Sequence, residues 1–149
     1  MKVTFKELLK SIKDTCLSHK QVKAYDYGDF YKKMKGNTYN YPLCFLTDTE
    51  SQIVGSEASL NFAFFVMDKL LSDGSNEETV LSDCLSIGLD IVGELQYCGE
   101  DKWFLDYSVV KMKSFTDNLS DVVGGWTFYF TIKINEAYNT CDAPFVRPV

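Results

Sequence analysis

The sequence has few of the residues on which metal binding and nucleic-acid binding depend. Histidine occurs once, at His19, and none of the five cysteines stands in C-x-x-C spacing. A zinc site would have to collect ligands from scattered positions, so we expect no metal site. The 15 basic residues are outnumbered by 21 acidic ones, and the net charge of −6 argues against a basic surface that grips DNA.

Long hydrophobic runs are also missing. The longest, residues 62–67 (FAFFVM), has the length of a strand, whereas a membrane-spanning helix needs roughly 20 apolar residues. The first residues, MKVTFKE, lack the apolar centre of a signal peptide. An odd number of cysteines fits buried free thiols in a reducing cytoplasm better than a disulfide framework. We therefore expect no membrane contact and no disulfides.

Catalytic patterns are weak. Cys16 lies three residues before His19, but it falls on the apolar stripe of a predicted helix, and His19 is expected to be exposed at the end of that helix. Gly124 and Gly125 lack the spacing of a phosphate-binding loop and indicate a bulge or a close backbone approach instead. We expect no catalytic residue, no cofactor and no enzymatic activity.

Aromatic residues, by contrast, are abundant, with 11 Phe and 9 Tyr. Thr4 and Glu7 form a capping box ahead of apolar residues at helical spacing. A second helix begins with Glu77 and Glu78 and contains Gly88 and Gly93, which would permit close approach to the sheet or to another subunit. The sequence predicts helices over residues 5–18 and 77–96, strands over 20–27, 41–46 and 56–68, and a loop or hairpin arm over 32–40.

The last third of the chain is an aromatic ribbon. Two strand-like runs, residues 103–115 and 126–134, flank a polar loop at 116–121. Bulky side chains occupy both faces of the second run, which predicts a partner surface that includes Trp126, Phe128 and Phe130. The same aromatics could instead form core or line a ligand pocket.

The order of these elements predicts an α+β fold, with a mainly antiparallel sheet, an N-terminal helix and a second helix packed on one face. The 149 residues suit a single domain, 1–149. Its core is expected over about residues 3–136, followed by an extended C-terminal arm over about residues 137–149.

The order helix, strands, long strand, acidic-start helix and two final strands resembles the compact domain of tail-terminator and neck proteins of tailed bacteriophages. Residues 121–132 (DVVGGWTFYFTI) and 139–144 (NTCDAP) are similar to small structural proteins of phages that infect Bacteroidales, including the crAss-like group. The resemblance implies a non-enzymatic virion protein, made in the host cytoplasm, that forms a homo-oligomeric ring of six or twelve copies at the head–tail junction or tail end.

The resemblance also implies contacts with other neck or tail proteins and a channel through which DNA passes without specific binding; the acidic balance fits such a lining. The arm would dock on a neighbour through Tyr138, Phe145 and Val146. The alternative is a monomeric cytoplasmic module that binds a small molecule or peptide. A ring protein should leave an elongated apolar patch on an outer edge, whereas a binding module should enclose its aromatics in one concave pocket.

Overall fold

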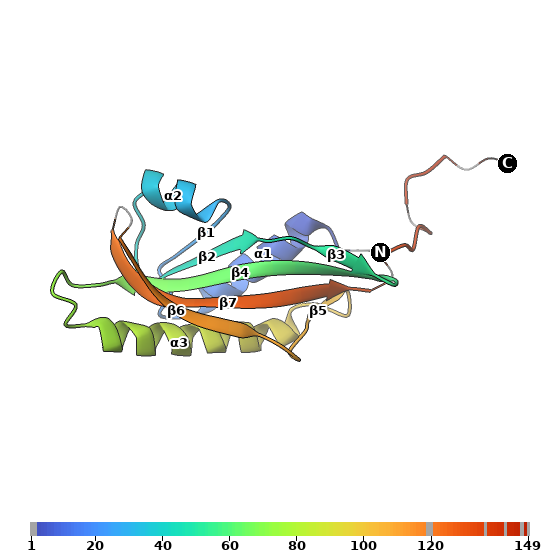
Figure 1. Ribbon diagram of the computed structural model, residues 1–149. Coiled ribbons are helices and arrows are strands. Elements are labelled where there is room, and N and C mark those ends of the chain that lie inside the picture. The colour runs from blue at the N-terminus through green and yellow to red at the C-terminus, as the bar shows by residue number, and fades with distance from the viewer. Residues whose placement is uncertain (1–2, 119–120, 136, 142, 147, 149) are drawn as a thin grey trace.

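The computed structural model describes residues 3–118, 121–135, 137–141, 143–146 and 148. It has an α+β fold, as the sequence predicts: a twisted sheet is covered by helices and an extended C-terminal segment leads away from it (Figure 1). The elements are α1 (Phe5–Ser18), β1 (Ala24–Tyr27), α2 (Phe30–Gly36), β2 (Leu43–Asp48), β3 (Gln52–Val54), β4 (Glu57–Lys69), α3 (Glu77–Glu94), the 3-10 turn η1 (Leu95–Tyr97), β5 (Trp103–Leu105), β6 (Lys111–Asn118) and β7 (Val122–Ile134).

The sheet is built around its two longest strands. β4 and β7 pair antiparallel from Ala58 opposite Ile134 to Lys69 opposite Val123. The strand order is β1-β2-β4-β7-β5; β3 pairs with β4 and β6 pairs with β7. Only the β1–β2 pair is parallel among the described strands. The expected mainly antiparallel sheet is therefore confirmed.

The main core lies between one face of the sheet and the helices α1 and α3. Period-two alternation places Phe62 and Phe64 of β4 on the same face as Phe128 and Phe130 of β7, and each of these side chains is at most 2% exposed. The helices contribute apolar stripes at three- and four-residue spacing. These stripes include Leu8, Ile12 and Cys16 of α1 and Cys84, Ile87 and Ile91 of α3.

The ends of α1 follow the sequence closely. The Thr4 hydroxyl accepts a hydrogen bond from the Glu7 amide at 3.1 Å, and the Thr4 amide donates to the Glu7 carboxylate at 2.9 Å. This reciprocal pair satisfies two amide groups that have no partner within the helix. The predicted range 5–18 and its capping box are both confirmed.

The prediction of a loop over residues 32–40 was wrong in its first part, because α2 is a short helix that packs on the opposite sheet face. The Asp29 side chain caps it by accepting from the Lys32 amide at 3.1 Å. Phe30 stacks on Phe65 with ring centroids 4.1 Å apart, and Met34 is fully buried. The sequence pattern did not predict this helix, because three of its seven residues are lysines and only Phe30 and Met34 are buried.

The aromatic ribbon also differs from its prediction. The first run is two strands, β5 and β6. Because β6 continues to Asn118, residues 116–118 of the predicted loop at 116–121 are strand; residues 119 and 120 lie outside the described residues, and β7 begins at Val122. Gly125 lies inside β7, opposite Met67 of β4. A Cβ at this position would lie 1.9 Å from the Val66 carbonyl oxygen, so only glycine fits the close approach of the backbones there.

Candidate interaction surface

β6 forms a long open edge of the sheet. It pairs with β7 on one side and with no strand of the described chain on the other. Six of its eight residues are exposed, including Lys111, Met112 and Lys113. The connection from β5 adds the exposed side chains of Tyr107 and Val109. An edge of this kind offers unpaired backbone groups to another chain, and its lysines limit indiscriminate pairing.

The opposite edge is different in length and chemistry. β1 has four residues, all partly exposed, and runs parallel to β2. β3 continues this side of the sheet with the exposed side chains of Ile53 and Val54. The two edges of the sheet therefore differ in length and in the side chains that they expose.

A polar cluster fixes β1 beneath α2. The Asp26 carboxylate accepts from the Tyr39 hydroxyl at 2.6 Å and from the Lys33 ammonium at 3.0 Å. Lys33 also donates to the Tyr27 carbonyl at 2.6 Å, and the Tyr27 hydroxyl donates to Asp48. Partial burial opposes ionisation of Asp26, but the hydrogen bonds from Tyr39 and Lys33 outweigh it and lower the pKa of this carboxyl below its ordinary value.

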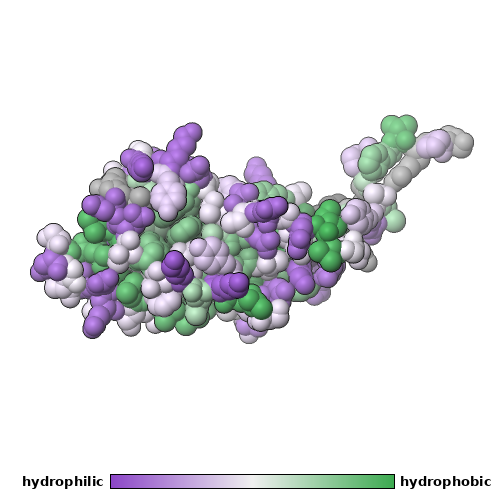
Figure 2. Space-filling view, in the orientation of Figure 1, coloured by the Kyte–Doolittle hydropathy of each residue, from purple (hydrophilic) through white to green (hydrophobic). Residues whose placement is uncertain are grey.

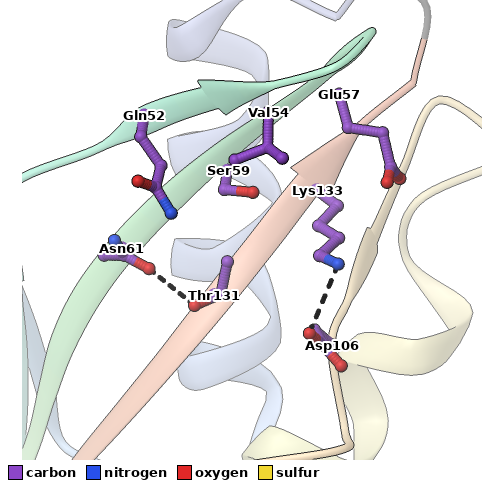
Figure 3. A pocket seen from close by; sticks show the side chains of 8 residues that line it. All are labelled: Gln52, Val54, Glu57, Ser59, Asn61, Asp106, Thr131 and Lys133. Carbon is purple, nitrogen blue, oxygen red and sulfur yellow. Dashed lines mark hydrogen bonds and ion pairs between the residues drawn. The ribbon is translucent and has the colours of Figure 1, made fainter.

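A polar hollow lies over β3, β4 and the end of β7 (Figure 3). Its volume is about 280 Å³. Lys133 pairs with Asp106 at 3.5 Å, and the Thr131 hydroxyl donates to Asn61 at 2.6 Å. The lining residues are Gln52, Val54, Glu57, Ser59, Asn61, Asp106, Thr131 and Lys133. None of them is aromatic, so this hollow does not enclose the aromatic side chains of the ribbon.

The predicted partner surface on β7 needs correction. Phe128 is fully buried and Phe130 is 2% exposed, because both pack between the sheet and the helices within one chain. They belong to the core and are not available to a partner in this fold. Trp126 is partly buried, and its indole N–H donates to the Leu81 carbonyl of α3 at 2.8 Å.

The other three predicted contact residues lie on the arm. Tyr138 is 66% exposed, Phe145 63% and Val146 fully exposed. The arm starts where the Ala137 amide donates to the Ser56 carbonyl at 2.7 Å, and then leads away from the domain (Figure 1). In Figure 2, hydrophobic residues (green) appear in the outer part of the arm. Residues 142, 147 and 149 of the predicted arm lie outside the described residues.

The single histidine joins the two long helices. His19 Nε2 lies 2.9 Å from the Asp90 carboxylate, and Nδ1 accepts from the Gln21 amide at 3.2 Å. The side chain is only 16% exposed, so the expectation of an exposed helix-end histidine was wrong. Sequence spacing gave no sign of this contact, because α3 supplies its acidic partner from 71 residues further along.

The cysteines are all free, and Cys16, Cys44 and Cys84 are buried in the core. Burial raises the pKa of the Cys84 thiol to about 12. A hydrogen bond with Cys16, together with burial, also raises the pKa of the Cys44 thiol. The Cys44 and Cys84 thiols therefore stay protonated at neutral pH, and all three buried cysteines pack as small apolar groups. The prediction of buried free thiols is confirmed for three of the five.

Within the described ranges, no group of three or more His, Cys, Asp or Glu side chains is placed to hold a metal ion. No helix in that part of the chain is long and apolar enough to cross a membrane. The chain matches no known family model, and no curated protein matches its sequence. The candidate surfaces for contact with another chain are the two unlike sheet edges and the arm.

Proposed function

We propose that this chain is a non-enzymatic structural subunit that assembles head to tail into a homo-oligomeric ring at the neck or tail end of a tailed phage. The observation that carries the proposal is the open β6 edge on a sheet whose other edge is different. When two unlike surfaces of one chain meet, each copy still offers a free surface, and association continues; it ends in a closed ring when the rotation between successive copies closes, and gives an open filament when it does not.

The arm supports the same function. It carries the exposed side chains of Tyr138, Phe145 and Val146 on a segment in which the described residues form neither helix nor strand. An isolated subunit gains nothing from exposing these groups, whereas a neighbouring subunit or adjoining neck protein could bury them. Burial of each large apolar side chain contributes about 1.5–3 kcal/mol before the cost of ordering the arm.

The charge balance fits the DNA channel implied by the family resemblance. A net charge of −6 repels phosphate, so DNA would pass through such a channel without being held. Negative-stain electron microscopy of the purified protein, combined with mass spectrometry of purified particles, tests this function. Closed rings and the presence of the protein in particles are expected; its absence from particles would contradict the virion assignment even if rings form.

The polar hollow of Figure 3 favours a second candidate, a monomeric module that binds a small polar molecule or a peptide. Its hydroxyl, amide and charged groups could hydrogen-bond a hydrophilic ligand. One double variant distinguishes the two candidate functions. Asn61→Ala together with Thr131→Val should leave ring assembly intact and abolish binding of a ligand to the hollow. A ligand that binds tightly to a strict monomer would favour this module.

A further inference from the structure

The registers of the sheet connect its two edges through rows of residues that lie directly opposite one another on neighbouring strands. One row runs from Asp26 of β1 through Phe45, Phe65 and Thr127 to Lys113 of β6. Directly opposite residues share one face of a sheet, so this row begins with a carboxylate and ends with an ammonium group on the same face.

The strand directions are also compatible at the two edges. β6 is antiparallel to β7, β7 to β4 and β4 to β2, whereas β2 is parallel to β1. β6 therefore runs antiparallel to β1. If a second copy is placed beside the first in the same orientation, its β1 meets the open edge of β6 as an antiparallel strand, which is the pairing that proteins use most often.

We propose that β6 of one copy pairs with β1 of the next, without a shift in register, and that Lys113 then lies opposite Asp26 of the neighbour. This pairing rests on the proposed ring function and identifies the contact that builds it. β-Strand addition supplies backbone hydrogen bonds, and the side chains of successive rows set the register.

The neighbouring rows are complementary as well. On one side, Met112, 46% exposed, would face Tyr27 of the next copy. On the other side, Ser114 would face Tyr25, and one row further Phe115 would face Ala24, so that a large side chain meets a small one. A thioether beside an aromatic ring is a favourable contact. The unshifted register therefore leaves no like charges directly opposite in these rows.

Charge supports this choice over pairing of β6 with β6. Lys113 is exposed and has no ion-pair partner among the described residues, whereas Asp26 is 27% exposed and forms an ion pair with Lys33 of its own chain at 3.0 Å. A symmetric β6–β6 contact would bring two lysine-bearing edges together and would leave both β1 edges open. The head-to-tail contact places a lysine against a carboxylate and uses both edges.

Carbodiimide cross-linking of the unmodified protein tests the pairing directly. The carbodiimide adds to the Asp26 carboxylate and forms an O-acylisourea. The Lys113 amine then attacks the acyl carbon, an amide forms, and the reagent leaves as a urea. Because Lys113 and Asp26 lie on opposite edges of one chain, a peptide that joins them must come from two copies. We expect this cross-linked peptide in the oligomer and not in the monomer fraction.

Charge reversal provides the second measurement. Lys113→Glu is expected to weaken self-association at least tenfold, whereas Lys13→Glu, which makes the same charge change on the exposed side of α1, should leave it unchanged. Rings whose cross-links join β6 to β6 or avoid β1 would overturn the strand pairing and leave the ring function standing. A chain that stays monomeric and gives no intermolecular link overturns both.

Discussion

Gly88 of α3 lies so close to the ring of Phe128 that a Cβ on residue 88 would stand 2.1 Å from the Cε2 atom. Glycine inside a helix costs up to about 1 kcal/mol relative to alanine, so Gly88 serves the close contact with Phe128 rather than helix formation. The sequence indicated close approach at both Gly88 and Gly93, but a Cβ on Gly93 would meet nothing within 4 Å.

Gly88→Ala is therefore expected to lower the free energy of unfolding by about 1–3 kcal/mol, because the methyl group displaces the buried ring of Phe128. Gly93→Ala is the matched control on the same helix and should be neutral or stabilising by up to about 1 kcal/mol. Urea denaturation of the two variants measures both values. Equal destabilisation would mean that α3 does not pack on β7 through Gly88.

Asp26→Asn is expected to destabilise the chain by about 1 kcal/mol at neutral pH, since it weakens the contacts with Lys33 and Tyr39 that hold α2. The pKa of Asp26 is lowered in the folded state, so its contribution is complete above the ordinary value of 3.8 and is lost as pH falls through the folded value. The variant should therefore lose less stability than the wild type below about pH 4.

Urea denaturation between pH 6 and pH 3 measures this difference. Glu94→Gln, an exposed acid near the end of α3, is the control and should follow the wild-type curve closely. Identical acid dependence of the wild type and Asp26→Asn would show that the cluster around Asp26 does not stabilise the fold.

Trp126→Phe is expected to lower the free energy of unfolding by about 1 kcal/mol, because the hydrogen bond from the indole to the Leu81 carbonyl is lost. The native mass should not change if Trp126 serves mainly to join β7 to α3. Denaturation and light scattering on the same sample distinguish the roles. Unchanged stability with a reduced native mass would instead support Trp126 as an interface residue.

Deletion of residues 138–149 is expected to abolish ring assembly while the monomer stays folded. The arm contributes exposed apolar groups and, among its described residues, none of the buried core. Far-UV circular dichroism and size-exclusion chromatography measure the two outcomes. The full-length double variant Phe145→Ser with Val146→Ser should show the same assembly defect in weaker form. Wild-type assembly after the deletion would show that the arm does not dock on a neighbour.

Features with strong local signals were predictable from sequence. The capping box of Thr4 and Glu7 fixed the start of α1, and the alternation of Leu60, Phe62 and Phe64 predicted β4. α2 was missed because seven residues are too few to show a helical period, and Phe30 and Met34 are its only buried side chains. Its stability comes from the Asp29 cap and the ring of Phe65, which is distant in sequence.

The candidate surface was only partly predictable. Bulky residues on both faces of β7 indicated a partner, but Phe128 and Phe130 are covered by the helices of their own chain. A single sequence does not reveal which face a helix will cover. The open edge of β6 and the row from Asp26 to Lys113 depend on strand order, which the sequence pattern left undetermined.

The native mass of the purified full-length chain, measured by light scattering across a concentration series, tests the central claim most directly. We predict a discrete species of six or twelve subunits that forms at the expense of the monomer as concentration rises. A two-subunit species that grows no further would contradict head-to-tail assembly through unlike edges, because it would mean that one edge pairs with itself.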